Sequence, residues 1–291
     1  MNVDQQTIKD VFSNFFIEQT GPESARNSVP LGFDSQAWER LAETGAHGMG
    51  VSLPEGGGAS LSELAIMSEE AGAHIAPLPI IDHIVSSRVL EKLNVLETEV
   101  LTGALIAGIA IRPTTKEVAK SVPSGAIANR LIALHEDKII LIKDEPPNRS
   151  LPNHGDLPIA HRELKNFSVI AEGEEAIEIF DRALNEWKTL ISAFLVGITR
   201  SSIEMTVSYV KDRHQFGKPI GSFQAVQHGL ADLPGLCDGA RLLVNKAAWA
   251  GDRQRNGEIN LGDNEISDFA ALASMSLVFA GETSLQATDR G

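Results

Sequence analysis

The twenty residues from Tyr209 to His228 read YVKDRHQFGKPIGSFQAVQH, and this stretch decides how the rest of the chain is interpreted. Its first half holds a cluster of four basic side chains within a chain whose formal net charge is −14: Lys211, Arg213, His214 and Lys218. The stretch joins two helical patterns, and an Arg guanidinium there can make paired hydrogen bonds to a pyrophosphate. The residues by themselves are compatible with a dinucleotide site or with the solvated basic end of a helix.

The sequence on both sides of this stretch predicts a helical bundle, residues 173–291. Before it, apolar residues recur at helical spacing and predict a long helix that ends near His214: Leu190, Ala193, Phe194, Gly197 and Ile198. After the Gln215–Ser222 connection a second helix should kink or break at Pro234 and Gly235, because proline in a helix interior costs about 3 kcal/mol. A last helix, capped by Asp263, carries further apolar residues: Ile266, Phe269, Ala270, Ala273 and Leu277.

The first third of the chain, residues 1–103, is also predicted to be helical. An amphipathic helix places five apolar residues on one face: Ile8, Val11, Phe12, Phe15 and Phe16. A second helix runs from a cap at Asp34 or Ser35 to Gly45, where glycine can adopt the left-handed conformation. A third opens on the capping-box pattern of Ser60 and Glu63 and ends at Gly72.

Between these helical parts, residues 104–172 predict a small β section. Residues 104–111 form an apolar run typical of a buried strand. Residues 130–134 and 138–142 are two more such runs, and the short connection Glu136-Asp137 predicts a hairpin. A last short strand is expected over Phe167–Ile170.

Composition excludes several classes of function. The negative charge makes a nucleic acid an unsuitable partner, because phosphate binding requires a surplus of Lys and Arg. No apolar run approaches the roughly 18 to 20 residues of a membrane span, so no membrane is expected. The single cysteine, Cys237, and the plain N-terminus predict a reducing, cytoplasmic location. The eight histidines lack paired ligand spacing, so no metal is expected.

Two stretches carry a resemblance to a known family. Residues 38–45, residues 48–58 with their triple glycine, and residues 69–72 (Glu-Glu-Ala-Gly) resemble the N-terminal domain of acyl-CoA dehydrogenases. The stretch from Tyr209 to His228 resembles, almost residue for residue, the turn between two helices of that family's C-terminal domain. The chain is therefore identified as resembling a short, heteromeric member of the steroid- or fatty-acid-degrading type.

This resemblance implies a mostly α fold with an N-terminal helical domain (1–103), a reduced β domain (104–172) and a C-terminal helical domain (173–291). It implies FAD as cofactor and an acyl-CoA substrate. In the family, the turn contacts the FAD of a neighbouring subunit. The matching positions of this sequence are therefore expected to bind the cofactor: Arg213, Gln215, Phe216 and Gln224. The resemblance also implies that the chain forms a homo-oligomer, or a hetero-oligomer with another acyl-CoA dehydrogenase-like subunit.

The resemblance leaves the catalytic residue unknown. In many members the catalytic Glu follows a Q-x-x-G-G-x-G segment, and the chain ends where that segment is expected to begin. Other members carry the Glu early in the first long C-terminal helix, where this chain has Trp187. Glu186 is one residue early and would point about 100° away, so the expectation is an exposed or capping side chain.

The β section also departs from the family, because neither its T-E-x-x-x-G-S-D-like loop nor its W-x-T strand is found between Leu101 and Gly173. Two hypotheses remain open: a flavin-dependent dehydrogenase subunit, or a catalytically silent partner of an active subunit. The face of the last helix is expected to be only partly covered, which favours an oligomer. That face comprises Phe269, Ala273, Leu277 and Val278.

Overall fold

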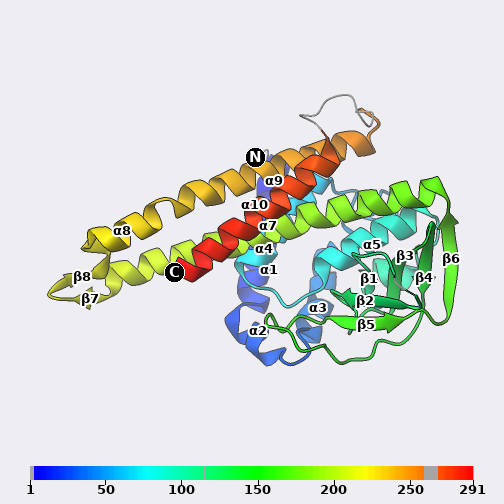
Figure 1. Ribbon diagram of the computed structural model, residues 1–291, viewed down its shortest axis with the longest axis horizontal. Helices are drawn as coiled ribbons and strands as arrows, with labels where there is room; N and C mark the ends of the chain where they lie inside the picture. The colour runs from blue at the N-terminus through cyan, green and yellow to red at the C-terminus, as the bar shows by residue number, and fades with distance from the viewer. Residues whose placement is uncertain (1–2, 115, 259–267, 291) are drawn as a thin grey trace. The chain divides into compact units, whose positions relative to one another are not determined.

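The computed structural model describes residues 3–114, 116–258 and 268–290, and the chain forms two compact units. Unit 1 combines residues 1–16, 61–75 and 188–291, and unit 2 combines residues 17–60 and 76–187. Each unit is thus assembled from segments far apart in the sequence (Figure 1).

The first third is helical as predicted, with three helices expected from the sequence and six found among its described residues. They are α1 (Val3–Gln19), α2 (Pro22–Asn27), α3 (Ser35–Leu41), α4 (Leu61–Ala73), α5 (Ile80–Lys92) and α6 (Thr98–Leu101), with 3₁₀ turns over Ala42–Thr44 and Ala46–Gly48. Asp34 caps α3 by accepting a hydrogen bond from the Ala37 backbone N–H at 3.0 Å. Gly45 follows the first of the two 3₁₀ turns and has a φ of 73°, the left-handed conformation expected of a glycine at a helix end.

Gly72 differs from its prediction as a helix stop, since it lies inside the last turn of α4. A Cβ added to Gly72 would lie 1.9 Å from the carbonyl oxygen of Phe194, and one added to Gly197 would lie 2.0 Å from that of Glu69. Both glycines therefore allow the backbones of α4 and α7 to approach closely, a tertiary requirement that local sequence does not reveal.

The larger sheet of unit 2 has four strands in the order β1-β3-β4-β6. They are β1 (Ala107–Ile109), β3 (Arg130–His135), β4 (Lys138–Ile142) and β6 (Phe167–Glu172). The predicted hairpin is confirmed, with β3 and β4 antiparallel and Leu134 opposite Ile139, while β1 runs parallel to β3. All residues of β3 and β4 except those at the strand ends Arg130, His135 and Lys138 are buried, which explains the apolar sequence between them.

Five described elements of unit 2 were not predicted, namely α2, α5, α6 and a pair of strands. Strands β2 (Val118–Val122) and β5 (Ala160–Glu163) form a separate antiparallel pair. Helix α5 lies against β1 and is buried almost throughout, although it carries Asp82, His83 and Arg88. Its apolar residues are interrupted by these polar ones on every face, so it shows no clear amphipathic period.

The bundle of unit 1 contains most of α7 (Glu174–Asp212), α8 (Gln224–Ala231), α9 (Leu233–Arg255) and α10 (Phe269–Arg290). The break predicted at Pro234 is confirmed, since the helix is interrupted at Asp232 and Pro234 lies in the first turn of α9. A proline there loses no hydrogen bond. The predicted cap Asp263 and Ile266 lie outside the described residues.

Helix α10 packs along α9, and Phe269 and Ala273 are buried in that contact. The expectation of an uncovered face is therefore wrong for these two residues. Val278 is 63% exposed, together with Met275 and Leu285 on the same side of α10. Helix α10 thus has an exposed apolar surface, but it lies on a different side of the helix from the predicted one.

Helix α7 contains an 18-residue stretch with a mean hydropathy of 1.3, enough to cross a membrane by length and composition alone. The sequence expectation did not anticipate this, because polar residues interrupt the apolar ones. Only 39% of this stretch is buried within the structure, and a single helix of this kind is weak evidence for a membrane span.

Candidate functional site

The four residues predicted to contact a cofactor lie together where α7 turns into α8, a segment of unit 1 visible at the far end of these helices in Figure 1. Strands β7 (His214–Gln215) and β8 (Lys218–Pro219) form a two-residue hairpin there. Its central residues, Phe216 and Gly217, have φ angles of 53° and 77°, as a tight hairpin turn requires. Residues 213–224, which contain all four predicted side chains, are named the α7–α8 turn.

The side chains of the α7–α8 turn are presented outward. Arg213, Gln215 and Gln224 are exposed, and Phe216 is 93% exposed, with its ring 6.2 Å from that of Phe223. Lys218 Nζ lies 4.3 Å over the Phe223 ring. Within the part of the chain that the structure describes, the guanidinium of Arg213 has no hydrogen bond or ion pair. The turn thus offers an unengaged cation beside exposed aromatic and amide groups.

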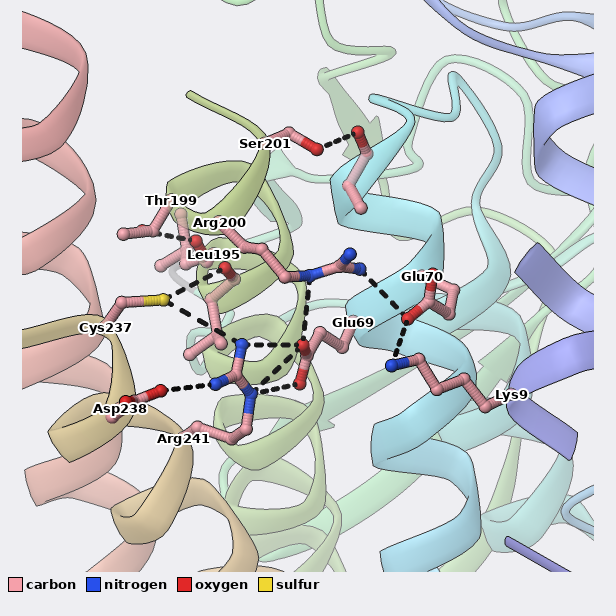
Figure 2. A network of polar contacts seen from close by, with 12 residues as sticks. Lys9, Glu69, Glu70, Leu195, Thr199, Arg200, Ser201, Cys237, Asp238 and Arg241 are labelled. Atoms are coloured by element: carbon pink, nitrogen blue, oxygen red, sulfur yellow. Dashed lines mark hydrogen bonds and ion pairs between the residues drawn. The ribbon is translucent and has the colours of Figure 1, made fainter. Parts of the chain in front are cut away.

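An ion-pair network holds the helices of unit 1 that carry this turn (Figure 2). Glu69 on α4 accepts hydrogen bonds from Arg241 of α9 at 3.1–3.2 Å, and its Oε1 lies 3.5 Å from Arg200 Nε of α7. Its neighbour Glu70 accepts from Arg200 Nη2 at 2.9 Å and lies 4.0 Å from Lys9 of α1. The two adjacent glutamates therefore tie α4 to three other helices.

Further polar contacts reinforce this framework. Ser201 Oγ donates to the carbonyl of Ala73 at 2.7 Å, and Arg241 also donates to Asp238. At the other end of α4, Asp252 of α9 accepts hydrogen bonds from the backbone N–H groups of Leu61 and Ser62. The Glu-Glu-Ala-Gly motif is thus explained as packing chemistry, and these residues are not available for a ligand.

The sequence expectation for Glu186 is wrong about its surroundings. Glu186 is 5% exposed, and Arg88 of α5 donates to both its carboxylate oxygens, at 2.8 and 3.3 Å. Arg88 also donates to the backbone carbonyls of Gly50 and Ala59. A carboxylate held in a buried forked pair is neither exposed nor a helix cap, and it is poorly suited to accept a proton.

The next residue, Trp187, leads to a second polar cluster of unit 2. Its indole Nε1–H donates to Asp82 Oδ1 on α5 at 2.7 Å. Burial raises the pKa of Asp82 to about 6, while the Trp187 hydrogen bond and then the Ser124 hydroxyl oppose that rise. The Ser124 hydroxyl is buried and acts on the Asp82 carboxyl as a hydrogen-bonding group. Asp82, Trp187 and Ser124 are named the Asp82 cluster.

Sequence reasoning missed Asp82. The available signal was a single acidic residue within the apolar run Ile80-Ile81-Asp82-His83-Ile84-Val85, which is unusual for a buried helix. Its relation to Trp187, 105 positions away, depends on tertiary packing. Among the described residues no group of three or more His, Cys, Asp and Glu side chains could hold a metal ion.

Comparison with known proteins agrees with this architecture. Residues 177–290 match the family model described as "Acyl-CoA dehydrogenase, C-terminal domain". The acyl-CoA dehydrogenase IpdE2 of Mycolicibacterium smegmatis is 26% identical over 256 residues, which cover 84% of this chain and 76% of the relative.

Solved structures with the same fold span the whole chain. A steroid ACAD, the Tcur3481-Tcur3483 G363A variant, superposes with a TM-score of 0.81 at 22% identity, covering 99% of this chain and 85% of that one. The ChsE4-ChsE5 complex from Mycobacterium tuberculosis gives 0.75 at 19% identity, with 100% and 95% covered. The FAD complex of PigA gives 0.79 at 19% identity, with 99% and 86% covered.

A helical N-terminal part, a small β section and a C-terminal bundle with a turn between its long helices define the acyl-CoA dehydrogenase fold. The matches to the C-terminal domain model and to curated dehydrogenases go further than the fold. The chain has the acyl-CoA dehydrogenase fold, and its residues 177–290 match that family's C-terminal domain.

Proposed function

We propose that this chain is a subunit of a cytoplasmic, FAD-dependent acyl-CoA dehydrogenase that catalyses α,β-dehydrogenation of an acyl-CoA thioester in lipid or steroid breakdown. The observation that carries this proposal is the α7–α8 turn, where Arg213, Gln215, Phe216 and Gln224 extend outward together. Relatives with the same fold include a steroid ACAD and a protein solved with FAD.

The residues of the turn fit the chemistry of FAD. Arg213 can make charge-assisted hydrogen bonds to the pyrophosphate, because no described residue engages its guanidinium. Gln215 and Gln224 supply amide donors and acceptors, and Phe216 supplies an aromatic face. When bound, the flavin accepts the hydride that leaves the β-carbon of the substrate.

The four side chains assigned to the cofactor are exposed within their own chain, so a cofactor held there needs walls from another subunit. An exposed apolar stripe on α10 favours such an assembly: Met275, Val278 and Leu285 are 55%, 63% and 70% exposed. Grouped exposed apolar side chains are typical of interfaces. The partner is a subunit of acyl-CoA dehydrogenase type, as in the ChsE4-ChsE5 complex.

A second function is favoured by one observation. Glu186, the acidic residue next to the position at which some family members carry their base, is neutralised by Arg88 in a buried pair. A chain without another proton acceptor would be a catalytically silent partner that contributes cofactor contacts and assembly surface.

Arg213→Ala tests the cofactor role. We expect the complex of this chain with its co-expressed partner to assemble normally but to lose flavin about ten-fold or more on gel filtration, since a charge-assisted hydrogen bond contributes about 1.5–3 kcal/mol. The absorbance of bound flavin at equal protein concentration measures this.

Lys211→Ala is the matched control, because Lys211 is an exposed cation two residues away on α7 and lies outside the proposed set. It should retain the flavin of the unaltered complex. Equal flavin content in the Arg213→Ala and Lys211→Ala complexes would contradict the assignment.

A further inference from the structure

The basic cluster around the α7–α8 turn is only partly used by the proposed cofactor site. It consists of Lys211, Arg213, His214 and Lys218, and the resemblance assigns a role to Arg213 alone. Residues 213–231 contain no Asp or Glu, although the chain has 39 of them. Because a strongly acidic chain repels anions, a segment that carries cations and no carboxylates is where an anion is favoured.

The geometry of the hairpin shows which of these cations lie together. Gln215 is opposite Lys218 in the pairing of β7 with β8. The pairing continues beyond the strands, since the Ile220 backbone N–H donates to the Arg213 carbonyl at 2.8 Å. Side chains directly opposite each other lie on the same face of a hairpin, and successive side chains of one strand alternate between faces. Arg213, Gln215 and Lys218 therefore share one face.

The other two cations lie elsewhere. His214 stands between Arg213 and Gln215 in the chain, so the alternation of the strand places it on the opposite face. Lys211 precedes Arg213 by two residues at the end of α7, which corresponds to about 200° around a helix axis. The face of Arg213 therefore gains a single further cation, Lys218.

An aromatic ring holds Lys218 in place. Its Nζ lies 4.3 Å from the centre of the Phe223 ring, and the same ring packs edge-on against that of Phe216, with their centroids 6.2 Å apart. Phe223 is half-buried, whereas Lys218 and Phe216 are exposed. Among the described residues Lys218 has no carboxylate within ion-pair distance. Its charge is thus positioned but not neutralised, so it can still bind an anion.

A purely structural role for Lys218 explains less. An ammonium group over an exposed ring contributes little to stability, and the stem of a neutral side chain of similar length would pack on Phe223 equally well. Such a role does not account for a second cation on the face of Arg213. The pyrophosphate of a dinucleotide carries two negative charges, which match these two cations in number.

We propose that Lys218 is a second pyrophosphate-binding residue of the FAD site and that Phe223 is its positioning residue. This inference rests on the proposed function. Arg213 supplies a planar guanidinium that can bind two phosphate oxygens at once, and Lys218 supplies a compact charge for the other phosphate. Phe223 restricts the Lys218 ammonium group, which reduces the entropy lost when that group binds an anion.

The test measures FAD binding by the complex of this chain with its co-expressed partner, after the flavin has been removed. Lys218→Gln should weaken FAD binding about ten-fold at low salt, because a charge-assisted contact is lost. The difference from the unaltered complex should shrink at high salt, since salt screens exposed charges. Lys218→Arg keeps the charge and should retain most of the affinity. Quenching of flavin fluorescence gives each dissociation constant.

Lys211→Gln is the matched control, because it removes an equal charge from another side of α7. It should leave FAD affinity unchanged, and a loss equal to that of Lys218→Gln overturns the inference. Phe223→Leu keeps both cations and should weaken FAD binding by about three-fold, with the salt dependence retained. A structural role for Lys218 predicts instead a lower melting temperature and a loss of affinity that salt does not change.

A further measurement needs no variant of Lys218. In the Arg213→Ala complex the remaining FAD affinity should still decrease with salt, because Lys218 still contributes its charge. An affinity that no longer depends on salt in this variant overturns the inference.

CoA also contains an adenosine pyrophosphate, so CoA without an acyl chain is the second ligand tested. A Lys218→Gln complex that loses affinity for CoA but not for FAD assigns Lys218 to the substrate and overturns the inference. Equal affinity of the Lys218→Gln and unaltered complexes for FAD also overturns it, and leaves the role of Arg213 and the proposed function intact. An unaltered complex that binds no FAD at any salt concentration contradicts the proposed function itself.

Discussion

At the scale of single residues, the positions that matter in unit 2 are the buried polar ones. Arg88 and Glu186 neutralise each other, Asp82 is held by an indole, and His47 and His83 are enclosed with Trp38. Each follows the rule that a buried polar group must be paired or neutral. The consequences for stability differ between these groups.

Arg88→Ala should destabilise the protein by about 3–5 kcal/mol, because it leaves the Glu186 carboxylate buried without its main partner. The double variant Arg88→Met with Glu186→Leu should recover most of this loss. Chemical denaturation of both variants measures the difference. If Arg88→Ala alone is as stable as the unaltered chain, the pair does not have the described burial in solution.

Glu186→Gln should leave dehydrogenase activity of the complex little changed, since the carboxylate is engaged by Arg88. Its stability should fall, because a neutral amide cannot balance the guanidinium. A thousand-fold loss of activity in a folded variant would make Glu186 the base.

Acid should weaken unit 2 through its two enclosed histidines. Burial lowers the pKa values of His47 and His83 to about 4 and about 3, so between those values and 6.5 the unfolded chain binds more protons than the folded one. Stability therefore falls as pH decreases from about 6.5. Asp82 acts in the opposite direction between about 6 and 3.8, but it is one group against two.

His47→Leu tests this effect, because neither ring nitrogen of His47 has a hydrogen-bond partner in the described part of the chain. We expect the melting temperature of the variant to fall less than that of the unaltered chain between pH 6.5 and 4.5. The difference should be about 2–4 °C for each kcal/mol of pH-dependent stability that His47 contributes. Thermal unfolding followed by circular dichroism measures it. An identical pH dependence would mean that other groups control acid stability.

At the scale of elements, the contact between α4 and α7 organises unit 1. Gly72 and Gly197 allow the two backbones to approach, and Glu69 and Glu70 then reach Arg200 and Arg241 (Figure 2). Helix α7 continues from this contact to the α7–α8 turn. The turn thus extends from a helix that is anchored to its neighbours, which suits a site that must hold a cofactor.

Gly72→Ala should destabilise the protein by at least about 3 kcal/mol, since its Cβ would lie 1.9 Å from a backbone oxygen that cannot rotate away. Gly229→Ala is the matched control. It lies within α8 with nothing within 4 Å of its added Cβ, and it should be neutral or stabilising by up to about 1 kcal/mol. Denaturation midpoints compare the two, and equal midpoints would refute the close approach.

At the scale of the whole molecule, the cofactor-binding residues and the exposed stripe of α10 both belong to unit 1, and both are uncovered within one chain. A single chain therefore offers half of a site and half of an interface. This explains why assembly and cofactor binding are expected to be coupled.

Val278→Lys should weaken assembly with the partner while leaving the melting temperature of the isolated chain unchanged, because the side chain is 63% exposed. Asn14→Lys adds the same charge at an exposed polar position of α1 and should assemble normally. Sedimentation velocity at micromolar concentration distinguishes them. Equal assembly by both variants, or a stable monomer of the unaltered chain that also binds flavin, would contradict the interface.

Local sequence determined the elements that depend on periodicity and turn chemistry. The hairpin of β3 and β4, the cap at Asp34, the left-handed Gly45 and the break before Pro234 all follow from neighbouring residues. The resemblance to acyl-CoA dehydrogenases followed from the N-terminal motifs and the stretch Tyr209–His228, and that stretch also located the α7–α8 turn. These features require no knowledge of distant contacts.

Tertiary structure decided which polar residues are neutralised and which remain free. Glu186 and Asp82 are both acidic residues within apolar helices, and nothing local distinguishes them. Arg88 pairs with one and Trp187 with the other, across 98 and 105 positions of sequence. Because a carboxylate's proton affinity depends on the charges and solvent around it, only the folded chain determines which one can accept a proton.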